Sequence, residues 1–146
     1  MQKKVFTRIE LHYKSILKGD QVEALQIMVI GTADTGKSYL IKAICQRLCS
    51  MAGNGFETPI LVITPTGITA FNINSSTIYS MLFILIFNKK SFDLNSDQLK
   101  QLQERLKNVI YFIIDEKSMV DRKMLTLIDM RLREAFSETS NVPFGG

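Results

Sequence analysis

An eight-residue loop, Gly31–Ser38, limits the possible folds of this chain more than any other segment. It reads GTADTGKS and matches the pattern G-x-x-x-x-G-K-[ST] in full. The apolar run Leu25–Ile30 before it is predicted to be a strand, and the spacing from Lys37 to about Ser50 predicts a helix. Glycines let backbone N–H groups curl around phosphate oxygens where such a helix begins. The loop therefore predicts a strand–loop–helix unit that binds nucleotide phosphates.

Within the loop, Lys37 and Ser38 have distinct expected roles. Lys37 is predicted to reach the β- and γ-phosphates and to act in catalysis, and the Ser38 hydroxyl is predicted to ligate Mg²⁺. Asp34 adds a carboxylate to a loop built for anions, so it either points outward or weakens binding, and both interpretations stay open. The remaining predicted nucleotide contacts are Gly31, Thr32, Ala33, Asp34, Thr35 and Gly36.

Two adjacent acids follow the apolar run Val109–Ile114, about 80 residues after the loop. Asp115 is predicted to hold Mg²⁺, usually through water, as the acid at this position does in phosphate-loop proteins. Glu116 is predicted to polarise the attacking water as a general base. A Glu directly after the Asp favours ATP hydrolysis by water over phosphate transfer to a small molecule.

Short apolar runs alternate with helical patterns along the rest of the chain. This alternation predicts an α/β fold with a parallel sheet flanked by helices. Residues 66–86 are expected to form short helices and turns, and Ser96 is expected to cap its helix. The predicted strands are Leu25–Ile30, Ile60–Ile63 (continuing into Thr64) and Val109–Ile114; the predicted helices run over about 5–17, 37–50, 96–108 and 121–136.

Length and composition narrow the class of protein. The chain has 146 residues, which favours one domain, and a net charge of +4, which permits an anionic partner without requiring one. Two cysteines and one histidine exclude a disulfide framework and a zinc site with four Cys/His ligands. The apolar run Met81–Phe87 is too short to span a bilayer. We expect an intracellular protein without a membrane partner.

Three segments together carry a specific resemblance. The phosphate loop, Pro65–Phe71 (PTGITAF) and Asp115–Val120 (DEKSMV) follow one another as in the petite-integration-frequency (Pif-type) DNA helicases of superfamily one, which they resemble. Pro143–Gly146 is similar to the lead-in to that family's next motif. The resemblance implies a RecA-like phosphate-loop NTPase fold, with residues 1–146 forming part of the first RecA-like domain and the C-terminal part of the fold lacking.

The resemblance implies an ATP-dependent DNA helicase that couples unwinding to ATP hydrolysis in DNA repair, recombination and telomere maintenance. By it, Gln2 contacts adenine, Thr66 and Gly67 lie along single-stranded DNA, and Thr77 and Tyr79 form a second DNA-contacting segment. The implied ligands are ATP, Mg²⁺ and single-stranded DNA or DNA junctions. The implied location is the nucleus, with the mitochondrion as an alternative. The family commonly has His in place of Tyr79 and Gly in place of Asp34.

The family's second RecA-like domain, which supplies arginine fingers, is expected to be missing. The 146 residues are therefore expected to hydrolyse ATP weakly or not at all. Two other functions stay open. One is an inactive, nucleotide-binding remnant of a mobile-element helicase. The other is a GTP-dependent switch, which Asn88–Ser91 (NKKS) argues against because Ser91 replaces the Asp that reads guanine.

Overall fold

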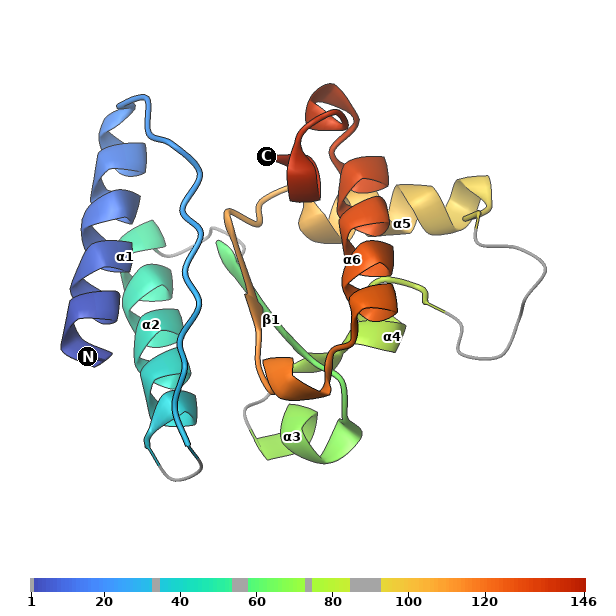
Figure 1. Cartoon of the computed structure of the whole chain (residues 1–146). Helices are drawn as coiled ribbons and strands as arrows, with labels where there is room; N and C mark the ends of the chain where they lie inside the picture. Colours follow the sequence, from blue (N-terminus) through green and yellow to red (C-terminus); the bar gives the residue numbers. More distant parts are fainter. Residues whose placement is uncertain (1, 33–34, 54–57, 73–74, 85–92) are drawn as a thin grey trace. The chain divides into compact units, whose positions relative to one another are not determined.

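A computed structural model of the chain describes residues 2–32, 35–53, 58–72, 75–84 and 93–146 (Figure 1). The chain divides into two compact units, Met1–Ile60 and Leu61–Gly146. Each unit is described below by itself. Across the described ranges, every helix is too short or too polar to cross a membrane.

The first unit is built on two helices, α1 (Gln2–Lys18) and α2 (Lys37–Ala52). Helix α1 is followed by Gly19, whose φ of 83° places it in the left-handed region that favours glycine. Both helices form where the spacing of apolar residues predicts them, and their buried side chains follow that spacing. These buried side chains are Ile9 and Tyr13 on α1 and Leu40, Ile44 and Leu48 on α2.

The predicted strand Leu25–Ile30 is wrong. Residues 20–32 form no regular secondary structure, and the side chains of Met28 and Ile30 are 67% and 76% exposed. A strand needs a neighbour that completes its backbone hydrogen bonds. Within the first unit this segment has no strand beside it, because the other regular elements described up to Pro59 are helices. An apolar run predicts burial, whereas strand pairing depends on residues far along the chain.

The second unit contains a three-stranded sheet with the order β2-β1-β3. The strands are β1 (Ile60–Thr64, which begins at the last residue of the first unit), β2 (Ser76–Thr77) and β3 (Tyr111–Ile114). Strand β1 pairs with β2 in parallel, with Ile63 opposite Ser76 and Thr64 opposite Thr77. Strand β3 runs in the same direction as β1 (Figure 1). The two predicted strands Ile60–Ile63 and Val109–Ile114 are thus confirmed, although β3 begins at Tyr111, and β2 was not predicted.

Helices of the second unit connect and cover these strands. Helix α5 is capped by Asn95 and not by the predicted Ser96, because the Asn95 side chain accepts a hydrogen bond from the Gln98 backbone and Gln98 reciprocates. The Asp121 carboxylate caps α6 by accepting a hydrogen bond from the Met124 backbone N–H at 2.7 Å. The helices are α3 (Gly67–Asn72), α4 (Ile78–Met81), α5 (Ser96–Leu106) and α6 (Arg122–Ala135), with short 3-10 helices η1 (Lys117–Met119), η2 (Ser137–Thr139) and η3 (Pro143–Gly145).

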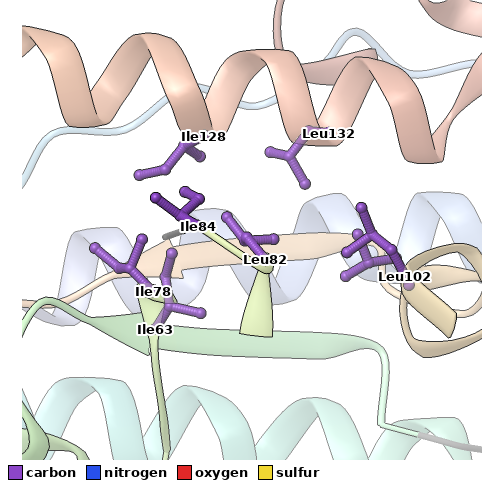
Figure 2. Packing of buried hydrophobic residues seen from close by; sticks show 8 residues of the cluster. Ile63, Ile78, Leu82, Ile84, Leu102, Ile128 and Leu132 are labelled. Atoms are coloured by element: carbon purple, nitrogen blue, oxygen red, sulfur yellow. The ribbon is translucent and has the colours of Figure 1, made fainter. Parts of the chain in front are cut away.

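The core of this unit lies between α6 and one face of the sheet. In Figure 2, Ile128 and Leu132 of α6 point toward Ile63 of β1 and toward Ile78 and Leu82. Further members of this cluster are Ile84, Leu102 and Leu106. Leu61, Phe112 and Ile114 pack against the cluster from the strands. Side chains alternate between the two faces along a strand. Thr64 follows Ile63 and Asp115 follows Ile114, so the side chains of Thr64 and Asp115 point to the opposite face of the sheet.

Candidate nucleotide-binding site

The backbone of the phosphate loop depends on its two glycines. Gly36 adopts φ 74°, in the left-handed region, and directly precedes α2. A Cβ atom on Gly31 would lie 2.8 Å from Thr35 Oγ1. That hydroxyl instead donates a hydrogen bond of 2.8 Å to the Thr32 carbonyl and ties the described ends of the loop together. The left-handed backbone therefore favours glycine at Gly36, and a side chain at Gly31 would have to displace the Thr35 hydroxyl.

The Lys37 ammonium group lies over the loop. Its Nζ donates hydrogen bonds to the carbonyl oxygens of Gly31 at 2.9 Å and Thr32 at 2.5 Å, and it lies 3.4 Å from Thr35 Oγ1. A phosphate can replace these neutral acceptors with charged oxygens, which form stronger hydrogen bonds to an ammonium group. Helix α2 has no acid in its first turn and no side-chain cap, and Ser38 is exposed in that turn. The start of α2 therefore has both the backbone donors and the charge that an anion needs.

Gln2 of α1 reaches the same loop. Its Nε2 donates to the Thr35 carbonyl oxygen, and a Cβ atom on Gly36 would approach that Nε2 to 3.0 Å. Helix α1 is held beside α2 by an ion pair in which Arg47 Nε donates to Glu10 at 2.8 Å. The first unit thus brings Gln2 and Lys37 to one loop. Ala33 and Asp34 lie outside the described residues.

The acidic pair lies where β3 ends. The Asp115 backbone N–H donates to the Ile63 carbonyl at 2.9 Å, which keeps Asp115 within the ladder of the sheet. Its side chain is buried, with 7% of the residue exposed, and its Oδ1 accepts a hydrogen bond from the Glu116 backbone. Glu116 is exposed and adopts φ 55°. Because of this left-handed backbone, the chain changes direction just after β3 ends.

The Asp115 carboxylate fits a metal ligand. Its Oδ2 is buried and has no hydrogen-bond partner among the residues that the structure describes. A buried carboxylate oxygen without a partner is costly, so it favours a cation or a water molecule beside it. No group of three or more His, Cys, Asp or Glu side chains that could hold a metal occurs in the described ranges. A site with few protein ligands is typical of Mg²⁺, which keeps several of its waters.

The four predicted DNA contacts lie in the second unit, at the carboxyl ends of β1 and β2. Gly67 is exposed and begins α3, and a Cβ atom there would meet nothing within 4 Å. Thr77 caps α4, accepting a hydrogen bond from the Ser80 N–H at 3.3 Å. Tyr79 is partly buried and packs against the core cluster. Thr66, between Thr64 and Gly67, is also partly buried.

The sequence analysis missed Thr64. It ends β1, is fully buried, and its Oγ1 has no hydrogen-bond partner within the described part of the chain. The available signal was a polar residue that closes an apolar strand, the same signal that drew attention to Asp115. The structure brings Gln2 to the phosphate loop, while the roles of Gln2, Asp115 and Glu116 stay predictions. The joining of Ser38 and Asp115 around one metal ion stays a prediction.

Comparison with known proteins gives the same family over the whole chain. The model of the PIF1-like helicase family matches residues 1–146. The chain is 31% identical over 122 residues to the ATP-dependent DNA helicase Pif1 of Psychrobacter sp. (82% of this chain, 18% of the relative). It is 31% identical over 127 residues to the ATP-dependent DNA helicase RRM3 of Saccharomyces cerevisiae (82% and 16%). The chain therefore spans less than a fifth of the length of these two relatives.

Comparison with solved structures points to the same helicase family. The crystal structure of Bacteroides sp. Pif1 in complex with ADP-AlF4 is similar with a TM-score of 0.66 at 26% identity, over 96% of this chain and 29% of that one. Bacteroides Pif1 in complex with ADP-AlF3 and single-stranded DNA gives a TM-score of 0.61 at 26% identity, over 90% and 29%. The expected RecA-like α/β fold is thus confirmed. With its phosphate loop, its acidic strand end and a family match along its full length, this chain belongs to the PIF1-like helicases.

Proposed function

We propose that this chain is the ATP-binding part of a DNA helicase motor, in which binding and hydrolysis of ATP drive movement along DNA. The observation that carries the proposal is the Lys37 ammonium group held over a glycine-bounded loop by carbonyl oxygens at 2.5 and 2.9 Å. Membership of the PIF1-like helicases supports ATP as the nucleotide. The similar Bacteroides structures were solved with ADP-AlF4 and with single-stranded DNA, which supports the same two ligands here.

In this proposal Mg²⁺ is held by Ser38 and Asp115, and it neutralises charge on the β- and γ-phosphates. Lys37 exchanges its loop carbonyls for phosphate oxygens when ATP binds. Gln2 contacts adenine. Glu116, exposed beside Asp115, orients the attacking water and accepts its proton. Positive charge on the far side of the γ-phosphate is expected from a second RecA-like domain.

Single-stranded DNA is proposed to run along Thr66, Gly67, Thr77 and Tyr79. The open space at Gly67 supports close approach of a sugar–phosphate backbone to the chain there. Tyr79 offers an aromatic face for a base. Its packing against the core cluster means that only part of the ring is accessible. Roles in repair, recombination and telomere maintenance, and a nuclear or mitochondrial location, follow from the resemblance and stay proposals.

The binding of a non-hydrolysable fluorescent ATP analogue tests the nucleotide site. Lys37→Ala removes a charge-assisted contact to phosphate and is expected to weaken binding by about 1.5–3 kcal/mol. Lys42→Ala removes an exposed lysine from the same helix and serves as the matched control. Equal affinities for the two variants would contradict the assignment of the loop.

A further inference from the structure

The sheet carries a row of polar residues where its strands end. Thr64 is the register partner of Thr77 on β2. On its other side, the hydrogen bond from the Asp115 N–H to the Ile63 carbonyl places Asp115 opposite Thr64 in the ladder with β3. Neighbouring strands lie about 4.8 Å apart, so the side chains of Thr64 and Asp115 are adjacent on one face.

Each of these two residues has an oxygen atom that no described residue contacts by a hydrogen bond. Thr64 is 0% exposed and Asp115 7%, and neither Thr64 Oγ1 nor Asp115 Oδ2 has a hydrogen-bond partner among the residues that the structure describes. They also form no direct hydrogen bond with each other. A single buried water can form hydrogen bonds with two adjacent buried polar atoms that otherwise lack partners.

We propose that Thr64 is a positioning residue for the metal-binding carboxylate, acting through one water molecule that bridges Thr64 Oγ1 and Asp115 Oδ2. The Thr64 hydroxyl accepts a hydrogen bond from that water or donates one to it, and the water holds the carboxylate in a fixed orientation. A Mg²⁺ ion beside Asp115 would keep several of its own waters, and Thr64 would then orient the water that it contacts. This inference rests on the proposed role of Asp115 in Mg²⁺ binding.

The remaining contacts of the row support this role for Thr64 over Thr77. The Thr77 hydroxyl lies 2.8 Å from Ser80 Oγ and accepts from the Ser80 N–H, so it is used in capping α4. The Asp115 Oδ1 atom is used by the Glu116 N–H. Thr64 Oγ1 and Asp115 Oδ2 are thus the two oxygen atoms of the row that are left for a water or a metal-bound water.

The test measures how much Mg²⁺ strengthens binding of a non-hydrolysable ATP analogue to the whole chain, as the ratio of affinities with and without Mg²⁺. Thr64→Val keeps the shape but removes the hydroxyl, and it is expected to reduce this ratio about 10-fold, as loss of an outer-shell partner does. Thr64→Ala is expected to give the same loss if Thr64→Val fails to fold. Thr64→Ser keeps the oxygen and is expected to restore the ratio.

Ser75→Ala is the matched control, because Ser75 Oγ is also a buried hydroxyl without a partner in the described ranges. Its ratio is expected to stay unchanged. Asp115→Asn separates the inference from the function on which it rests. If Asp115→Asn removes the Mg²⁺ effect while Thr64→Val and Thr64→Ala keep it, the positioning role is wrong and the metal site stands. If Asp115→Asn also keeps it, the proposed metal site itself is overturned.

Discussion

Glu116 combines a proposed catalytic role with an unusual backbone conformation. Its φ of 55° lies in the left-handed region, which L-residues with a Cβ atom adopt at a cost of about 1–2 kcal/mol. The Asp115 Oδ1 atom accepts a hydrogen bond from the Glu116 N–H at 2.9 Å, and Met119 N–H donates to the Glu116 carbonyl at 2.9 Å. These contacts hold the strained residue directly after Asp115, the acid proposed to bind Mg²⁺. Strain maintained at such a position is typical of a functional site.

Substitutions at Glu116 are expected to separate stability from hydrolysis. Glu116→Gly relieves the left-handed strain and should raise the free energy of unfolding by about 1 kcal/mol. Glu116→Gln should leave stability unchanged and slow any ATP hydrolysis, because an amide cannot accept the proton from water. Glu116→Val, with a branched Cβ, should destabilise. Urea titration gives the stabilities, and a Gly variant no more stable than the Gln variant would contradict the strain.

At the scale of elements, α6 holds the segment that follows it through Asp129. The Asp129 carboxylate accepts a hydrogen bond from the Phe144 N–H at 2.6 Å and pairs with Arg133 Nε at 2.9 Å. Arg133 Nη1 in turn donates to the Ser140 carbonyl at 3.2 Å. One acid and one base therefore attach η3 and the residues before it to a helix whose opposite side packs on the sheet.

These contacts predict how stability depends on pH. Partial burial of Asp129 raises the pKa of its carboxyl, but the Phe144 amide and the Arg133 guanidinium outweigh burial and lower this pKa below its usual value of 3.8. A lowered folded-state pKa stabilises the fold above the unfolded pKa, and this stabilisation is lost as pH falls through the folded value. Asp129→Asn should therefore reduce stability at pH 6 and flatten its decline below about pH 4.

Thermal unfolding between pH 2 and pH 6 measures this dependence. Glu138→Gln, an exposed change in η2, is the control and should keep the acid-side decline of the original chain. If the stability of Asp129→Asn fell as steeply toward pH 2 as that of the original chain, titration of Asp129 would not be the cause of the acid-side loss of stability.

At the scale of the molecule, the two residues predicted to ligate Mg²⁺ belong to different units, Ser38 to the first and Asp115 to the second. If the two residues hold the same Mg²⁺ ion, removing either one already removes most of what the metal contributes. The double variant Ser38→Ala/Asp115→Asn should then weaken Mg²⁺-dependent ATP binding by clearly less than the sum of the single variants. The same affinity measurements on all four proteins provide this cycle. Additive losses would show that the two side chains act on the nucleotide independently.

Short-range patterns in the sequence determined most of the local structure. Helical spacing predicted α1, α2 and α6, since one face of a helix must be apolar to pack. The phosphate loop was predicted because its glycines and its lysine are required by backbone geometry and charge within eight consecutive residues. Asp115 was predicted because a charged residue that ends an apolar strand stands out from its neighbours.

Only the tertiary structure decided which apolar runs pair as strands and which polar atoms lack partners. Leu25–Ile30 has the composition of a strand but forms no strand within its unit, whereas Ser76–Thr77, two polar residues, forms β2 because it lies opposite Ile63 and Thr64. Thr64 closes an apolar strand in the sequence, but only the register of the sheet placed it beside Asp115. Strand pairing and the satisfaction of hydrogen bonds are relations between residues distant in sequence, so no local pattern encodes them.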